Sequence, residues 1–262
     1  MAWVESHSES FSARHESGHA RQASEVLHDL EEFRRRLSSL FEVIPSEIAV
    51  VMHARSIALS LAHPWLPLAR RVAAPASRRY FAGWFAEHEI HVLAPNALER
   101  RASAVAGSSE ALRLTPRHEY SHLVLGANNP DLPPPFSLAR FRQYVRWAWL
   151  CEGAAAWLSG QTPLFRAAIV RRMREGGRPE FPPAPSDAML LGGTVFTLLE
   201  RRRGTHVAAA LATSPLERGA LGLIAEAFDR PVAAVERDWR EELDSMAASA
   251  QADPPTAPAS SR

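Results

Sequence analysis

Two histidines and a glutamate lie within five residues, in the run His118-Glu119-Tyr120-Ser121-His122. In an α-helix, residues i and i+4 lie on one face, so His118 and His122 could bind one metal ion together. Glu119 would lie about 100° round the helix axis, beside a coordination position that neither histidine fills. A carboxylate there could act as a general base toward a water molecule on the metal. The spacing therefore predicts a helix that carries two metal ligands and a proton acceptor.

A third ligand is predicted in the apolar run 147–158, where Glu152 is the only charged residue. The run is long enough for a buried helix, and a carboxylate in a core has to be neutralised, hydrogen-bonded or bound to a cation. Three protein ligands with one open position are typical of catalytic zinc, whereas structural zinc usually has four ligands, often cysteines. Cys151 is the only cysteine, which excludes a thiolate-rich site. Gly153 has no Cβ and would let this helix approach a neighbour closely.

These residues resemble the zinc site of the gluzincin peptidases, the group that includes thermolysin and the aminopeptidases. In that group the histidines of H-E-x-x-H bind zinc together with a glutamate on the next long helix, often in the pattern E-G-x-A-x-[YW]. Here the second pattern runs from Glu152 to Trp157, and Glu152 is the thirtieth residue after His122. The resemblance covers residues 79–160 with some specificity and the C-terminal helices more loosely.

The resemblance implies a zinc-dependent metallopeptidase that hydrolyses peptide bonds in a peptide or protein substrate. One Zn²⁺ ion would be bound by His118, His122 and Glu152, and Glu119 would be the general base. In thermolysin an aspartate four residues after the ligand glutamate orients a histidine. Ala156 stands at that position here, so another residue would have to orient the histidine.

The sequence departs from the gluzincin pattern at the residue that stabilises the oxyanion. Related enzymes commonly carry a tyrosine or histidine for this purpose on a C-terminal helix, whereas the tyrosines here, at 80, 120 and 144, all precede Glu152. His206 is the only histidine after Glu152 and is the first candidate, with Tyr144 second. A chain without such a donor could instead be a non-hydrolytic, zinc-binding pseudo-peptidase that recognises a peptide or protein. Both interpretations stay open at this point.

Other histidines are predicted to lie outside the metal site. A second H-E-x-x-H run, His15-Glu16-Ser17-Gly18-His19, contains glycine and serine, which disfavour a helix and so the one-face geometry. His88 and His91 lie near an expected strand, and two histidines three residues apart on a strand would face opposite sides of it, so a joint metal site is not expected.

Composition excludes several classes of protein. The 262 residues are 46% hydrophobic and 23% charged, as in an ordinary globular protein with one core or two closely packed lobes. Thirty basic and 29 acidic residues leave a net charge of +1, so electrostatics gives no reason to expect a nucleic-acid partner. The N-terminus lacks the pattern of a secretory signal, and no stretch approaches the ~20 apolar residues of a membrane span. We therefore predict a cytoplasmic protein without a membrane partner; its oligomeric state is not predicted.

The hydrophobic pattern and the resemblance together predict an α+β, zincin-like fold. It would have a small mixed N-terminal sheet with a backing helix, the H-E-x-x-H helix at the centre and a mainly helical C-terminal lobe. Strands are expected at 9–15, 48–52, 80–85 and 89–93, and helices at 20–41 and 54–68, the second broken by prolines. In gluzincins an edge strand before the zinc helix binds the substrate backbone, and 82–84 or 90–92 would take that role.

The C-terminal part is expected to be helical throughout. The H-E-x-x-H helix should have Thr115 as N-cap and Pro116 at its first position, and the Glu152 helix should run over 137–158. Further helices are expected at 163–174, 187–203, 205–212, 216–228 and 231–247. We predict an N-terminal α/β part with the sheet and the edge strand (1–114), one catalytic unit (115–248) and a disordered tail (249–262).

Overall fold

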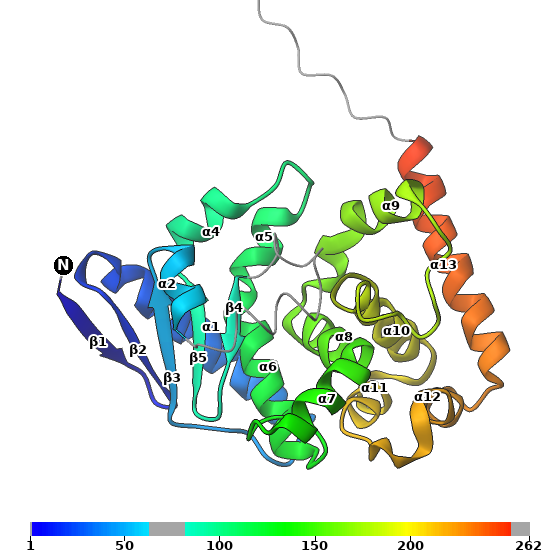
Figure 1. Cartoon of the computed structure of the whole chain (residues 1–262), viewed down its shortest axis with the longest axis horizontal. Coiled ribbons are helices and arrows are strands. Elements are labelled where there is room, and N and C mark those ends of the chain that lie inside the picture. The colour runs from blue at the N-terminus through cyan, green and yellow to red at the C-terminus, as the bar shows by residue number, and fades with distance from the viewer. Residues whose placement is uncertain (1, 63–81, 253–262) are drawn as a thin grey trace, which may run out of the picture.

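The computed structural model describes residues 2–62 and 82–252 and has an α+β fold, as predicted. A five-stranded mixed sheet lies on one side of the molecule and a group of helices on the other, with α6 (Thr115–Asn128) between them (Figure 1). The strands are β1 (Trp3–His7), β2 (Phe11–Glu16), β3 (Ile48–His53), β4 (Gly83–Phe85) and β5 (Glu89–Leu93).

The strand order is β1-β2-β3-β5-β4. Strands β2, β3 and β5 are parallel, whereas β1 and β4 are antiparallel to their neighbours and form the two edges. The sequence predicted one strand at 9–15, which corresponds to β2, and did not predict β1. Strand β1 is mostly exposed and so lacks the regular alternation of apolar and polar residues that indicates a half-buried strand. The placement of 90–92 as a substrate-binding edge strand is wrong, since β5 is paired on both sides; β4 is an edge.

Successive side chains of a strand point to opposite faces of the sheet, and each face packs against a different hydrophobic core. Helix α1 (Ala20–Leu37) packs on one face through buried residues that include Leu27, Leu30 and Phe33. On the other face, α2 (Ser56–Leu61), α4 (Pro95–Arg101) and α5 (Ser108–Arg113) form a smaller core with Trp84 and Leu93. The helix expected at 54–68 is described only as far as α2, and the parts of that helix and of the strand 80–85 that fall within 63–81 lie outside the described residues.

Polar contacts attach α6 to the sheet side of the molecule. Arg117 donates two hydrogen bonds to the carboxylate of Asp29 on α1. The hydroxyl of Tyr120 donates to the carbonyl of Pro45 at 2.6 Å, and its ring lies edge-on to Phe11 with the ring centres 5.0 Å apart. The face of α6 that carries Tyr120 is thereby fixed against the sheet, and the helix also packs against α8 (Ala148–Ser159).

The helix predicted at 137–158 is divided into α7 (Leu138–Arg146) and α8. Trp147 interrupts it with a non-helical backbone, at φ −106° and ψ 23°. No glycine or proline marks this break, so the sequence pattern could not predict it. The close approach expected at Gly153 is confirmed: a Cβ there would lie 2.5 Å from the carbonyl carbon of Gly192 on α10 (Ala188–Arg203).

The remaining C-terminal helices agree with the sequence pattern to within a few residues. They are α9 (Arg166–Glu175), α11 (Thr205–Ala212), α12 (Gly219–Phe228) and α13 (Val232–Ala252), with short 3₁₀ turns η3 (Thr162–Phe165) and η4 (Leu216–Arg218). Helix α13 lies on the outer side of the helical group (Figure 1) and extends into the segment predicted as a tail from 249; residues 253–262 lie outside the described part. Across residues 2–62 and 82–252, no helix combines the length and apolar character that crossing a membrane requires.

Candidate metal centre

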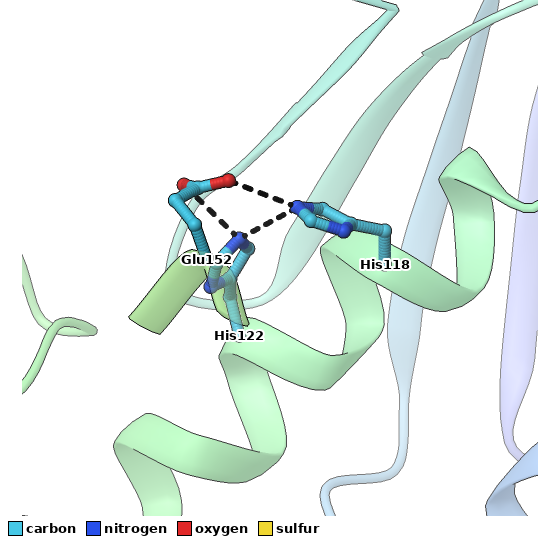
Figure 2. A group of neighbouring side chains, drawn as sticks. All are labelled: His118, His122 and Glu152. Atoms are coloured by element: carbon cyan, nitrogen blue, oxygen red, sulfur yellow. Dashed lines mark hydrogen bonds and ion pairs between the residues drawn. The ribbon is translucent and has the colours of Figure 1, made fainter. Parts of the chain in front are cut away.

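Helices α6 and α8 bring the three predicted metal ligands together, as Figure 2 shows. One ligand atom each from His118, His122 and Glu152 lies within 4.8 Å of the other two. Nε2 of His118 is 3.2 Å from Nε2 of His122 and 3.3 Å from Oε2 of Glu152, and Nε2 of His122 is 3.7 Å from Oε1 of Glu152. Within the described ranges, no other group of three His, Cys, Asp or Glu side chains could hold a metal ion. Atoms that converge in this way can share one cation.

The first turn of α6 differs slightly from the prediction. The helix begins at Thr115, with Leu114 in the N-cap position, and Pro116 is the second helical residue. Thr115 does not cap the helix, because its hydroxyl donates to the carbonyl of Leu112 at 2.6 Å. This shift of one residue leaves His118 and His122 on one face.

The buried charges of the triad depend on one another. Burial alone would raise the pKa of Glu152, but the hydrogen bond with His118 and the charges of both histidines hold that pKa at about 2. Burial opposes a charge on His118, and the hydrogen bond and charge of Glu152 outweigh it, so the pKa of His118 is raised. Burial lowers the pKa of His122 to about 3. The buried carboxylate of Glu152 needs a positive partner, and a divalent cation bound to the same atoms would supply that charge, so the donor set fits a metal ion.

Glu119 lies beside the triad, against the edge strand. A Cβ on Gly83 of β4 would be 2.8 Å from Oε1 of Glu119 and 2.6 Å from Cγ2 of Thr115. A glycine is therefore needed for β4 to contact α6 at the carboxylate. Burial raises the pKa of Glu119 to about 8, although His118 opposes the shift. A carboxylate with a raised pKa is suited to accept a proton and to donate it again.

Tyr144, the second candidate for the oxyanion donor, lies at the site. Its hydroxyl donates a hydrogen bond to Oε1 of Glu152, and its ring centre is 5.8 Å from that of His122. Burial and the charge of Glu152 raise the pKa of Tyr144 well above its usual value. The hydroxyl therefore keeps its proton and can act as a donor.

His206, the first candidate, does not lie at the site. It is exposed on α11 and does not line the cavity beside the triad. Helix α11 is held by a buried alanine- and leucine-rich face, which leaves His206 on the solvent side. Helix α10, where related enzymes commonly carry the oxyanion tyrosine, has Gly192 and Gly193. A Cβ on Gly192 would be 2.6 Å from the carbonyl oxygen of Trp149, and a Cβ on Gly193 would be 2.1 Å from Oγ1 of Thr162, so neither position has room for a tyrosine.

A cavity of about 260 Å³ opens beside the triad and Glu119. Most of its other lining side chains are apolar, among them Trp84, Phe85, Phe136, Phe141, Leu164 and Met189. Phe85 of β4 stacks on the ring of His122, with the ring centres 4.5 Å apart. The sequence did not single out Phe85; its position two residues after Gly83, on the same side of an edge strand, was the available signal.

The two histidines of the second H-E-x-x-H run lie in different elements. His15 lies on β2, and its ring nitrogens are hydrogen-bonded to Ser6 Oγ and to the carbonyl of Glu16, both at 2.9 Å. His19 lies in the 3₁₀ turn η1 (Ser17–His19), so the two histidines share no helix face. His91 is buried and 2.9 Å from His53 on the neighbouring strand, a pairing that the sequence did not predict.

Comparisons with known proteins do not identify this chain: no protein-family model, no curated protein and no solved structure matches it.

Proposed function

We propose that the protein is a zinc-dependent metallopeptidase with a zincin-like fold and with Glu119 as the general base. The observation that carries this proposal is the convergence of His118, His122 and Glu152 beside a cavity that Glu119 also lines. Two imidazoles and one carboxylate are a ligand set of catalytic zinc, and three protein ligands leave a position for water or substrate.

The side chains of the cavity could divide the chemistry among them. Bound zinc would polarise the substrate carbonyl and make a water molecule more acidic. Glu119 would accept a proton from the attacking water and later deliver it to the leaving amine. The hydroxyl of Tyr144 would turn from Glu152 to donate to the developing oxyanion. The edge of β4 would bind the substrate backbone as an added strand, and the apolar wall would receive a neighbouring apolar side chain.

A zinc-binding module that recognises a peptide or protein without hydrolysing it is the second candidate. The composition of the cavity wall favours it, because no tyrosine or histidine after Glu152 is among the described residues that line the cavity. The hydroxyl of Tyr144 also donates its hydrogen bond to the proposed metal ligand Glu152 in the free protein, and not to a substrate. Glu119 favours the peptidase, since a binding module gains nothing from a proton acceptor beside the metal.

Cleavage of a peptide library by the zinc-loaded protein tests the proposal. We expect hydrolysis that is lost when a chelator removes the metal and that returns when zinc is added back, with products identified by mass spectrometry. Peptides that bind the zinc-loaded protein and are recovered intact would instead identify the non-hydrolytic module.

Gly83→Ala is expected to lower hydrolysis while zinc binding is retained. The added methyl group would collide with Glu119 and Thr115 and displace the base, and a misplacement of about 1 Å can cost roughly 100-fold in rate. Zinc content and turnover should be measured side by side. Gly18→Ala is the matched control, because a Cβ there meets nothing within 4 Å. Unchanged turnover in the Gly83 variant would contradict the position given to Glu119.

Tyr144→Phe is expected to lower turnover by about 10²–10³-fold, which is the usual cost of losing one oxyanion donor. The variant keeps the ring that packs near His122 and loses only the hydroxyl. Steady-state kinetics should show the loss mainly in kcat, with zinc content retained. His206→Ala, the control, should behave like the wild type. Equal kcat in the Tyr144 variant would mean that another group stabilises the oxyanion.

A further inference from the structure

His118 has a second ring nitrogen that the ligand triad does not use. Its Nε2 atom is directed toward Glu152 and His122, whereas Nδ1 lies on the far side of the ring (Figure 2). Nδ1 is buried and makes no hydrogen bond of acceptable geometry. A buried polar atom without a partner is costly, so this nitrogen calls for an explanation.

Binding of a metal would define the chemistry of this nitrogen. An imidazole that gives the lone pair of Nε2 to a metal carries its proton on Nδ1, so Nδ1 becomes a hydrogen-bond donor. Histidines that bind metals almost always donate this N–H to a carboxylate, a carbonyl or a water, which fixes the ring and its tautomer. Ala156 cannot serve in this way, because it has no acceptor on its side chain.

Gln161 carries a matching acceptor. It is 2% exposed, follows the C-cap Gly160 of α8 and lines the same cavity as His118. Its Nε2 atom donates to the carbonyl of Ala111 on α5 at 2.7 Å. A backbone carbonyl can only accept, so this bond decides which end of the amide is nitrogen and which is oxygen. The oxygen that remains, Oε1, is buried and has no partner of its own.

The side chains of His118 and Gln161, which carry the two unpaired atoms, lie near each other. Gln161 lies close enough to the His118 ring to act on it as a hydrogen-bond acceptor, although the two atoms do not form a bond of good geometry in the free protein. A donor and an acceptor, each buried and unpaired, therefore lie in the wall of one cavity.

We propose that Gln161 is a positioning residue of the metal site, whose side-chain carbonyl accepts the Nδ1–H of His118 when the metal is bound. The bond satisfies both buried atoms, holds the tautomer that presents Nε2 to the metal and makes the imidazole a stronger ligand. It also connects His118, through the amide of Gln161, to Ala111 on α5. The inference rests on the metal site of the proposed function and does not depend on peptide hydrolysis.

A purely structural role for Gln161 would consist of its hydrogen bond to Ala111. Two substitutions separate this role from a positioning role. Gln161→Met fills the space but offers neither a donor nor an acceptor. Gln161→Glu loses the donor to Ala111 and keeps an acceptor for His118. A structural role predicts that both variants change alike, whereas a positioning role predicts that zinc affinity differs between them.

Zinc affinity, measured by chelator competition on the full chain, is the primary test. We expect Gln161→Met to weaken binding by about 10–100-fold and Gln161→Glu to restore it to near the wild-type value. Thr162→Val is the control, because Thr162 is buried beside Gln161 with an unpaired hydroxyl but does not line the metal cavity. Its affinity should equal that of the wild type, and thermal unfolding of each zinc-free protein records losses of stability separately.

The possible failures can be told apart. Equal affinities in the wild type and Gln161→Met, or an equal loss in the Met and Glu variants, would overturn the role of Gln161 and leave the metal site in place. A wild-type chain that binds no zinc would overturn the metal site and this inference together. A chain that binds zinc and hydrolyses nothing, with the expected split between Met and Glu, would support the role of Gln161 and contradict only the peptidase.

The ring proton supplies a second readout that a structural role would not change. In the zinc-loaded protein labelled with ¹⁵N-histidine, the Nδ1–H resonance of His118 should be protected from solvent exchange in the wild type and in Gln161→Glu. In Gln161→Met it should exchange faster, and the resonance of His122 serves as an internal reference. Equal exchange rates in all three proteins would overturn the hydrogen bond.

Discussion

Glu119→Gln is expected to reduce peptide hydrolysis by about 10²–10⁴-fold while the zinc content stays at the wild-type level. An amide has nearly the shape of the carboxyl group but cannot take a proton from the attacking water. The fold should be retained, because Glu119 is 7% exposed in a site that already favours its neutral form, as its raised pKa indicates. The measurement is kcat/KM on a cleaved library peptide, together with elemental analysis of the same sample.

The second H-E-x-x-H run provides the matched control for this experiment. Glu16 occupies the same place in that run as Glu119 does in the first, and it lies on β2 away from the triad. Glu16→Gln should therefore leave both zinc content and hydrolysis unchanged. Hydrolysis that survives intact in Glu119→Gln would assign the activity to another site or to a contaminant and would contradict the role of Glu119.

His122→Ala is expected to abolish stoichiometric zinc binding, because it removes one of three ligands from a site with little else to hold the ion. The substitution also removes the ring that stacks on Phe85, so some loss of stability is expected. Glu152→Gln is the second variant, and it shows whether a loss of zinc comes from the lost ligand or from misfolding. The amide keeps the shape of the carboxyl group and can still hydrogen-bond inside the core, so the fold should be retained. It loses the negative charge, and zinc affinity measured by chelator competition should fall with the fold intact.

The control is the double change of His15 and His19 to alanine, which should leave zinc content untouched because the two residues lie on a strand and in a 3₁₀ turn. Loss of zinc in that variant would mean that the metal binds at the other run. Unchanged zinc affinity in both His122→Ala and Glu152→Gln would remove the proposed site.

The three candidate ligands were predictable because each carries a local signal. A spacing of four places His118 and His122 on one face of any helix, whatever surrounds it. Glu152 stands out as a single charge in an apolar run, and burial of that run follows from its composition. The C-terminal helices were predictable for the same reason, since hydrophobic periodicity is a property of neighbouring residues.

What the sequence could not predict depends on contacts between distant segments. The order of strands, which makes β4 an edge and β5 an interior strand, is set by pairing across the sheet. The orientation of His206 depends on which face of α11 packs inward. Gln161 lies beyond the end of the ligand helix, and its relation to His118 exists only after α5, α6 and α8 have packed together. The break between α7 and α8 falls at Trp147, and tryptophan is not a residue type that marks the end of a helix.

The contact between Gly153 and Gly192 has a mechanical consequence for the ligand beside it. Helices α8 and α10 touch there backbone to backbone, without the layer of side chains that could change rotamer to absorb a displacement. The two helices are therefore expected to move together at this contact, and Glu152 is the residue next to Gly153. A tilt or slide of α10, which carries no metal ligand, would therefore displace the backbone at Glu152 directly, so a helix outside the site helps to set the position of the ligand.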